Sequence, residues 1–189
     1  MRRRKAGSGP PRWLRIAGAA TANAINARND EVPMKQQDEN VQRKHIDLPE
    51  SFIFSTEYEV LYSDVNSANH LGADRVLPIA MEAQLRFIKR LGYTDAMAFE
   101  DAGLIMAHSE VQYLSEAKYG EKLLIELTPS NLGRKSFNLV YRIQNLTQDR
   151  ELARVVTTLL FFDYQASCVI EVPETFRDRI AKVQASNRC

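Results

Sequence analysis

The sequence predicts an α+β domain in which an antiparallel sheet is folded around one long helix. Three observations support this prediction. A stretch with a period of two begins at Phe54 and indicates a strand, and one long stretch with helical spacing follows it up to Leu91. From Leu104 to Val172 the remaining strong signals are those of strands, which favours antiparallel pairing with the helix packed on the sheet.

The first strand is predicted over residues 54–62, where the side chains alternate in character. One face of this strand carries Phe54, Thr56, Tyr58, Val60 and Tyr62. The residues between them are mostly polar, as expected when one face meets a core and the other meets water. The polar segment 63–72 that follows is predicted as a loop.

A helix of about four turns is predicted to end at Leu91, with Gly92 as its stop. Its apolar stripe is predicted to be Leu77, Met81, Leu85 and Ile88, which are spaced by four, four and three residues. Proline is tolerated only in the first turn of a helix. We therefore expect regular helix to begin just before Pro78, with residues 73–76 as a looser lead-in.

The later strands are predicted at residues 104–114, 122–128, 136–144, 152–164 and 169–172. Gly120, Gly133 and the segment 147–149 mark turns between them. Pro173 opens a short polar helix that is expected to end near Gln184.

The composition excludes several classes of protein. The 189 residues are 44% hydrophobic and 26% charged, as in an ordinary globular domain with a tail. The formal net charge of +1 gives no reason to expect a nucleic-acid or anionic-membrane partner. Two cysteines without metal-ligand spacing suggest neither a disulfide framework nor a metal site, so we expect a reducing compartment, the cytoplasm. No stretch approaches the roughly 18 apolar residues of a membrane span.

The N-terminal segment differs from the rest of the chain. Residues 1–28 carry seven basic side chains and no acidic one. Arg15 interrupts the apolar run, which argues against a signal peptide and leaves a transit peptide or a disordered extension, with Met34 as a second potential start. Residues 34–50 are polar and aperiodic and are predicted as a linker. We therefore expect an extension and linker over residues 1–50 and a folded domain over residues 51–189.

The loop between the first strand and the helix carries a recognisable pattern. Residues 62–93 (YSDVNSANHLGADRVLPIAMEAQLRFIKRLGY) resemble hot-dog-fold thioesterases of the 4-hydroxybenzoyl-CoA and YbgC-like type. Members of that group carry a motif close to D-x-D-x-x-G-H-x-N-N at this place, followed by a glutamate on the helix. Further similarities lie at residues 116–121, 133–137 and 161–164, so the resemblance covers about residues 54–180 and implies the hot-dog fold.

Four loop positions align with this motif. Asp64 takes the place of the first aspartate and Asn66 that of the second. Asn69 stands for the glycine and His70 for the histidine. The resemblance places Asp64, Asn66 and His70 at the catalytic centre and Asn69 in contact with the substrate. The residue types alone also permit bracing roles, because such side chains commonly bond turn amides, and His70 can serve as a base near neutral pH or hold the loop.

The motif continues into the helix. Gly72 and Ala73 take the places of the asparagine pair, and Glu82 takes the place of the helical glutamate. By the resemblance, the amide of Ala73 or Gly72 would stabilise an oxyanion, since free N–H groups at a helix N-terminus favour negative charge. Gly72 also suits a plain turn. Glu82 would order or deprotonate water, although its i,i+4 spacing to Arg86 equally suits a solvent-facing ion pair.

The resemblance implies an acyl-CoA thioesterase that uses carboxylate-activated water and needs no cofactor, because coenzyme A is part of its substrate. Arg134 and Lys135 lie at a strand turn and would contact the coenzyme A phosphates, although charged turns are often only solvated. The resemblance also implies a homodimer or a tetramer with sites between subunits. An open sheet edge favours the same pairing.

Asn66 departs from the motif, because an amide can neither accept a proton as a base nor act as a carboxylate nucleophile. Hydrolysis would then need Asp64 or Glu82 as its carboxylate. Two alternatives stay open. One is a hot-dog hydratase or dehydratase acting on an enoyl or hydroxyacyl thioester, although the loop lacks the proline of D-x-N-P-x-H and places His70 one residue too far from Asp64. The other is a non-catalytic acyl-thioester binding protein.

Overall fold

The computed structural model describes residues 45–95 and 100–186, so the predicted N-terminal extension lies outside the described residues. The elements in chain order are β1 (Phe54–Glu59), a 3-10 helix η2 (Tyr62–Asp64), α1 (Ala73–Arg90), β2 (Gly103–Tyr113), β3 (Lys122–Ser130), β4 (Ser136–Asn145), β5 (Arg150–Asp163), β6 (Cys168–Val169) and α2 (Glu174–Ser186). The predicted α+β class is confirmed.

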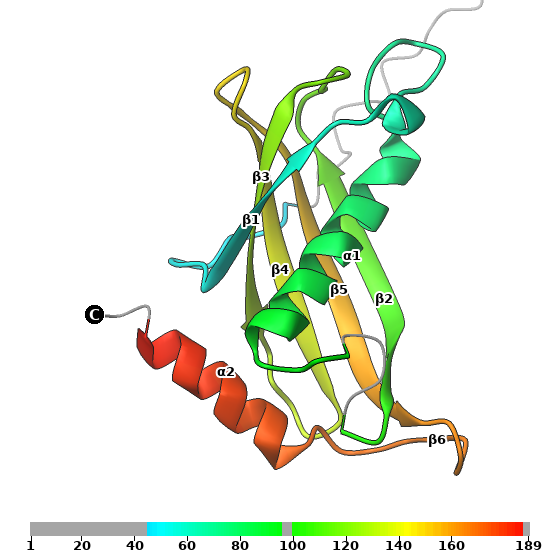
Figure 1. The fold of residues 1–189 in the computed structure, drawn as a ribbon, viewed down its shortest axis with the longest axis vertical. Coiled ribbons are helices and arrows are strands. Elements are labelled where there is room, and N and C mark those ends of the chain that lie inside the picture. The colour runs from blue at the N-terminus through cyan, green and yellow to red at the C-terminus, as the bar shows by residue number, and fades with distance from the viewer. Residues whose placement is uncertain (1–44, 96–99, 187–189) are drawn as a thin grey trace, which may run out of the picture. The chain divides into compact units, whose positions relative to one another are not determined.

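The strands form one antiparallel sheet around α1. Their order is β1-β3-β4-β5-β2, and β6 pairs with β5. α1 lies across one face of this sheet, and its N-terminus is at the end of the sheet where β1 and β2 terminate (Figure 1). α2 lies at the opposite end (Figure 1). β1 and β2 are the two outer strands of this order. The strands between them contribute buried side chains to the core that they share with α1.

The core lies between α1 and the central strands. β1 alternates between half-buried and exposed residues, as its period of two predicts. The central strands have neighbours on both sides and are more continuously buried. Side chains in this core with under 2% exposure include Phe87, Ile88, Leu123, Ile125, Leu127, Leu139, Tyr141 and Ile143.

The start of α1 differs from the prediction. The helix begins at Ala73 and continues through Pro78, so the expected start just before Pro78 was wrong. Proline removes one hydrogen bond, the one to the carbonyl of Asp74 four residues earlier. Asp74 is exposed in the first turn, where water can replace the lost donor.

The buried face of α1 also differs from the predicted stripe. The side chains that face the sheet are Val76, Ile79, Ala80, Ala83, Gln84, Phe87 and Ile88. Of the predicted residues, Ile88 is buried, Leu77 and Leu85 are half-buried, and Met81 is 43% exposed. Both stripes have helical spacing. The small side chains of Ala80 and Ala83 allow a closer approach to the sheet, which explains why this face is the buried one.

The later elements lie largely where the sequence predicts them. β2 to β5 begin and end within two residues of the expected bounds. The hairpin between β4 and β5 closes at the pair Asn145–Arg150, with Asp149 at φ 49°. β6 is shorter than predicted and ends at Val169, because the chain then turns toward Pro173 and α2.

Among the described residues, His45 and Ile46 already pack against the sheet, ahead of the expected boundary at Ser51. Ile46 is 5% exposed and its N–H donates to Gln112 Oε1 at 3.1 Å. Its carbonyl accepts a hydrogen bond from Arg154 Nη1 at 2.9 Å. The last residues of the predicted linker therefore contact β2 and β5.

Candidate active site

Two cavities flank the N-terminal half of α1. The β2-side cavity has a volume of about 230 Å³ and is lined by Asn66, His70, Leu71, Ala73, Val76, Tyr113, Ser115, Glu116 and Leu152. The β1-side cavity has a volume of about 280 Å³ and is lined by Tyr58, Asp64, Arg75, Pro78, Ile79, Glu82 and Arg86. The predicted catalytic residues are thus divided, with Asn66 and His70 in the first cavity and Asp64 and Glu82 in the second.

A tight loop separates the two cavities. Val65 and Leu71 form an antiparallel bridge, and Asn66 N–H donates to the carbonyl of His70 at 2.9 Å. Asn69 has φ 64°, a left-handed conformation that glycine adopts freely and asparagine tolerates. Asn69 aligns with the glycine of the motif, and its left-handed backbone is one that both residue types adopt.

Asp64 braces this loop. The residue is 8% exposed, and its Oδ2 accepts hydrogen bonds from the Tyr58 hydroxyl at 2.7 Å and from Leu61 N–H at 2.9 Å. Its backbone carbonyl accepts a third from Gly72 N–H at 2.8 Å. Burial, the hydrogen bond to Asp64 and the charge of that carboxylate raise the pKa of Tyr58 to about 12. Asp64 therefore ties together β1, η2 and the start of α1.

Glu82 lies on α1 and is ion-paired. Arg86 Nε donates to Glu82 Oε1 at 2.8 Å, the i,i+4 pair that the spacing allows. Arg86 Nη1 also donates to Thr56 Oγ1 at 2.8 Å and to the carbonyl of Glu57 at 2.9 Å. The Glu82 side chain is 46% exposed, so its ion pair with Arg86 is partly solvated within a single chain. Through Arg86 this ion pair links α1 to β1.

Asn66 and His70 are both held by local hydrogen bonds. Asn66 Oδ1 accepts from Ala68 N–H at 2.9 Å. His70 Nδ1 lies 3.1 Å from the carbonyl oxygen of Leu71 and 3.4 Å from Asn66 Nδ2. Because a carbonyl oxygen can only accept, the bond to Leu71 requires the proton on Nδ1. The neutral ring then keeps Nε2 as an acceptor.

The N-terminus of α1 distinguishes between the two predicted oxyanion donors. The N–H of Gly72 is occupied by the carbonyl of Asp64. Ala73 is the first residue of the helix, lines the β2-side cavity, and within the described residues its N–H has no hydrogen-bond acceptor. Gly72 has no side chain that could cap the first turn. The amide available to a ligand is therefore that of Ala73.

Arg134 and Lys135 lie at the other end of the sheet. They precede β4, whose ten residues extend about 30 Å at the usual rise per residue. Neither residue lines the two cavities beside α1. The Arg134 side chain is 70% exposed and pairs with Glu171 at 2.5 Å. The fold therefore does not bring this turn to the N-terminus of α1 within one chain.

Sequence reasoning missed three polar residues of the β2-side cavity. Tyr113 is 53% exposed, and its hydroxyl donates to the carbonyl of Ala73 at 2.9 Å. Ser115 and Glu116 follow β2 and line the same cavity. Glu116 begins the segment that resembles the family, but nothing in its spacing from the loop indicates that the two meet in space.

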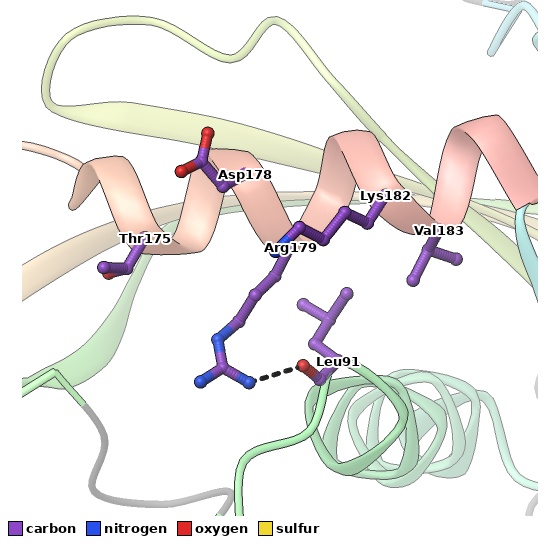
Figure 2. A pocket seen from close by; sticks show the side chains of 6 residues that line it. All are labelled: Leu91, Thr175, Asp178, Arg179, Lys182 and Val183. Carbon is purple, nitrogen blue, oxygen red and sulfur yellow. Dashed lines mark hydrogen bonds between the residues drawn. The ribbon is translucent and has the colours of Figure 1, made fainter.

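Figure 2 shows a further cavity, of about 450 Å³, between the end of α1 and α2. Its walls are formed by Leu91, Thr175, Asp178, Arg179, Lys182 and Val183. Arg179 extends toward Leu91 and donates to its carbonyl at 2.8 Å, and its guanidinium carbon lies 4.3 Å from the centroid of the Tyr93 ring. Arg179 therefore satisfies a carbonyl at the end of α1, which is a structural role.

Within residues 45–95 and 100–186, no three His, Cys, Asp or Glu side chains are grouped as a metal site would require. In the same part of the chain, neither α-helix combines the length and the apolar character needed to cross a membrane.

Comparison with known proteins places this chain in a family. The chain is 28% identical to a 1,4-dihydroxy-2-naphthoyl-CoA hydrolase from Synechococcus elongatus over 122 residues, which cover 63% of this chain and 88% of the relative. A 1,4-dihydroxy-2-naphthoyl-CoA thioesterase from Synechocystis has a similar structure, with a TM-score of 0.63 and 20% identity over 69% of this chain and 97% of the other.

A third relative is a 4-hydroxybenzoyl CoA thioesterase mutant solved in complex with 4-hydroxybenzoyl CoA. It superimposes with a TM-score of 0.62 and 17% identity over 67% of this chain and 97% of the other. These similarities confirm the hot-dog fold. A sequence profile of the thioesterase-like superfamily matches residues 60–180, well over half of the chain. The protein therefore belongs to the thioesterase-like superfamily.

Proposed function

We propose that this protein is an acyl-CoA thioesterase that hydrolyses its substrate in the β2-side cavity. The observation that carries the proposal is the open N–H of Ala73 at the N-terminus of α1, in a chain that belongs to the thioesterase-like superfamily. Attack of water on a thioester places negative charge on the carbonyl oxygen. An N–H at a helix N-terminus stabilises such charge, because its hydrogen bond and the helix dipole act together.

The walls of the cavity suit an acyl group. Leu71, Val76 and Leu152 give it apolar surface, and Asn66 and His70 place polar atoms at one side. A volume of about 230 Å³ favours a compact acyl group. The relatives are named for naphthoyl and hydroxybenzoyl thioesters of coenzyme A, so we propose an aromatic acyl-CoA as the first substrate class to test. Coenzyme A is then part of the substrate.

We further propose a homodimer or a tetramer in the cytoplasm. β2 is an edge strand of eleven residues, long enough to pair with a second copy. Arg134 and Lys135 lie far from the Ala73 amide, so a contact with coenzyme A requires either the distant nucleotide end of the substrate or a second subunit. Cys168 is an exposed free thiol, which is consistent with a reducing compartment. Light scattering of the purified chain measures the oligomeric state.

The direct test is thiol release by the full chain from a panel of acyl-CoAs with aromatic, short and long acyl groups. Release of free coenzyme A establishes hydrolysis and ranks the acyl groups. A change in enoyl absorbance without thiol release would instead identify a hydratase. Binding with neither change would identify an acyl-thioester binding protein, and either result refutes the proposal.

The role of the amide is tested by Ala73→Pro, which deletes one N–H. Proline is favoured at the first position of a helix, and Gly72 has φ −64° and ψ 139°, the extended conformation that a residue before proline adopts. We expect kcat to fall about 100- to 1,000-fold with the fold unchanged. Ala73→Ser keeps the N–H and serves as the control. Equal rates in the two variants would exclude the Ala73 amide as the oxyanion donor.

A further inference from the structure

Glu116 is a carboxylate of the β2-side cavity that the motif does not include. The residue is exposed and lines the cavity together with Ala73 and His70. In the described part of the chain, no hydrogen-bond or ion-pair partner is present for its carboxylate. Its exposed oxygen atoms are therefore free to accept a hydrogen bond from a water molecule.

The backbone around Glu116 is held from both sides. Its own carbonyl accepts a hydrogen bond from Arg150 Nη2 at 2.9 Å, and Ser115 Oγ donates to the carbonyl of Glu151 at 2.8 Å. On the other side, Leu71 N–H donates to the carbonyl of the fully buried Ala117 at 2.7 Å. This last bond joins the segment after β2 to the loop that precedes α1, so the backbone of Glu116 is held beside the segment that carries His70 and Ala73.

The carboxylates predicted from the motif are differently placed. Asp64 Oδ2 accepts two hydrogen bonds, and Glu82 is paired with Arg86. Both line the β1-side cavity, whereas Ala73, whose N–H is open, lines the β2-side cavity. A base must share a cavity with the oxyanion donor and have a free lone pair. Of these three carboxylates, Glu116 meets both conditions.

We propose that Glu116 is the base that activates water for thioester hydrolysis, an inference that rests on the proposed function. Glu116 takes a proton from water while the water oxygen bonds to the thioester carbon, and the resulting oxyanion is bound by Ala73 N–H. The intermediate then re-forms its carbonyl and the C–S bond breaks. The departing thiolate takes the proton from Glu116, so one thioester and one water give one carboxylic acid and one thiol.

The test compares three isosteric variants of the full chain: Glu116→Gln, Asp64→Asn and Glu82→Gln. Thiol release, acyl-CoA binding and urea unfolding are measured for each variant. We expect Glu116→Gln to lower kcat about 100-fold or more, the usual size of a general-base effect, with binding and unfolding midpoint unchanged. We also expect the wild-type kcat to fall toward acidic pH and the residual kcat of Glu116→Gln to lack this fall. Glu59→Gln, an exposed glutamate on β1, is the matched control and should keep wild-type kcat.

A second variant keeps the test informative if Glu116→Gln folds poorly. In Glu116→Ala, added formate is a small carboxylate that can occupy the vacated space, and we expect it to raise kcat in proportion to its concentration. A wild-type chain that hydrolyses acyl-CoA while Glu116→Gln retains a rate within about threefold overturns this inference alone. A wild-type chain that releases no thiol from any substrate overturns the proposed function, and this inference with it.

Discussion

Asp64→Asn separates a bracing role from a chemical one at the residue that the motif identifies most directly. Asparagine has the same shape and retains one oxygen acceptor, but it has no charge. Hydrogen bonds to a charged group contribute about 1.5–3 kcal/mol each and neutral ones about 0.5–1.5 kcal/mol. Asp64 accepts two such bonds, from Tyr58 and Leu61, and is only 8% exposed. We therefore expect the free energy of unfolding to fall by about 2–3 kcal/mol.

The pKa of Tyr58 gives an independent readout of the same contact. In the wild type this pKa is raised from 10.0 to about 12 by burial, the hydrogen bond to Asp64 and the charge of Asp64. A raised tyrosine pKa stabilises the fold fully below pH 10, and this contribution is lost as pH rises through about 12. Asp64→Asn removes the charge of Asp64 and weakens its hydrogen bond, whereas burial still raises the pKa of Tyr58, so this pKa moves back toward 10.0. The difference in stability between the two proteins should therefore narrow in alkali.

Urea unfolding at neutral and alkaline pH measures the stability, and tyrosinate absorbance measures the titration. Tyr58→Phe is the matched control, since it removes the titrating group and leaves the Asp64 carboxylate in place. Thiol release should stay within about threefold of the wild-type rate, as expected for a group outside the reacting cavity. A variant with wild-type stability and a kcat lowered 100-fold or more would place Asp64 in the chemistry and refute the bracing role.

Three further predictions concern the frame around the site. Burial raises the pKa of Glu121, but hydrogen bonds from Lys118 N–H, Asn145 and Gln148 outweigh it and lower that pKa below 4.5. The Glu121 carboxylate therefore stabilises the fold above pH 4.5, and this stabilisation is lost as pH falls through the lowered pKa. Glu121→Ala should therefore lower the free energy of unfolding at pH 7 by about 2–3 kcal/mol and flatten the acid unfolding curve followed by circular dichroism. Arg179→Met removes the hydrogen bond to the Leu91 carbonyl and the contact with the Tyr93 ring, so it should lower the free energy of unfolding in urea by about 1–2 kcal/mol. Arg179→Lys should recover part of this free energy. Asn69→Ala should lower the free energy of unfolding by about 1–2 kcal/mol, because alanine disfavours the φ of 64° at this position. Asn69→Gly should keep wild-type stability, and equal melting temperatures of the two variants would contradict this prediction.

Local patterns were sufficient to predict most of the elements. The alternation from Phe54 predicted β1, and β2 to β5 lie within two residues of their expected bounds. These predictions succeed because the period of two of a strand is visible in neighbouring residues of the sequence. The turn at residues 147–149 was likewise evident from its residue types. The helix was harder. Leu77, Met81 and Leu85 have helical spacing, but the sheet packs on Ala80 and Ala83, and that choice depends on how closely two elements approach.

The sequence by itself determined the α+β class, the elements and the motif loop, because each of these depends on residues close together in the chain. Only the tertiary structure decided which groups share a cavity. In the fold, the Gly72 N–H donates to the Asp64 carbonyl, whereas the Ala73 N–H stays open. The fold also places Asp64 and Glu82 on the other flank of α1. It also brought Glu116 beside His70 through the hydrogen bond from Leu71 to Ala117. That contact joins segments more than forty residues apart, and no spacing in a sequence specifies such a pairing, because it depends on the order of the strands and the packing of α1 across them.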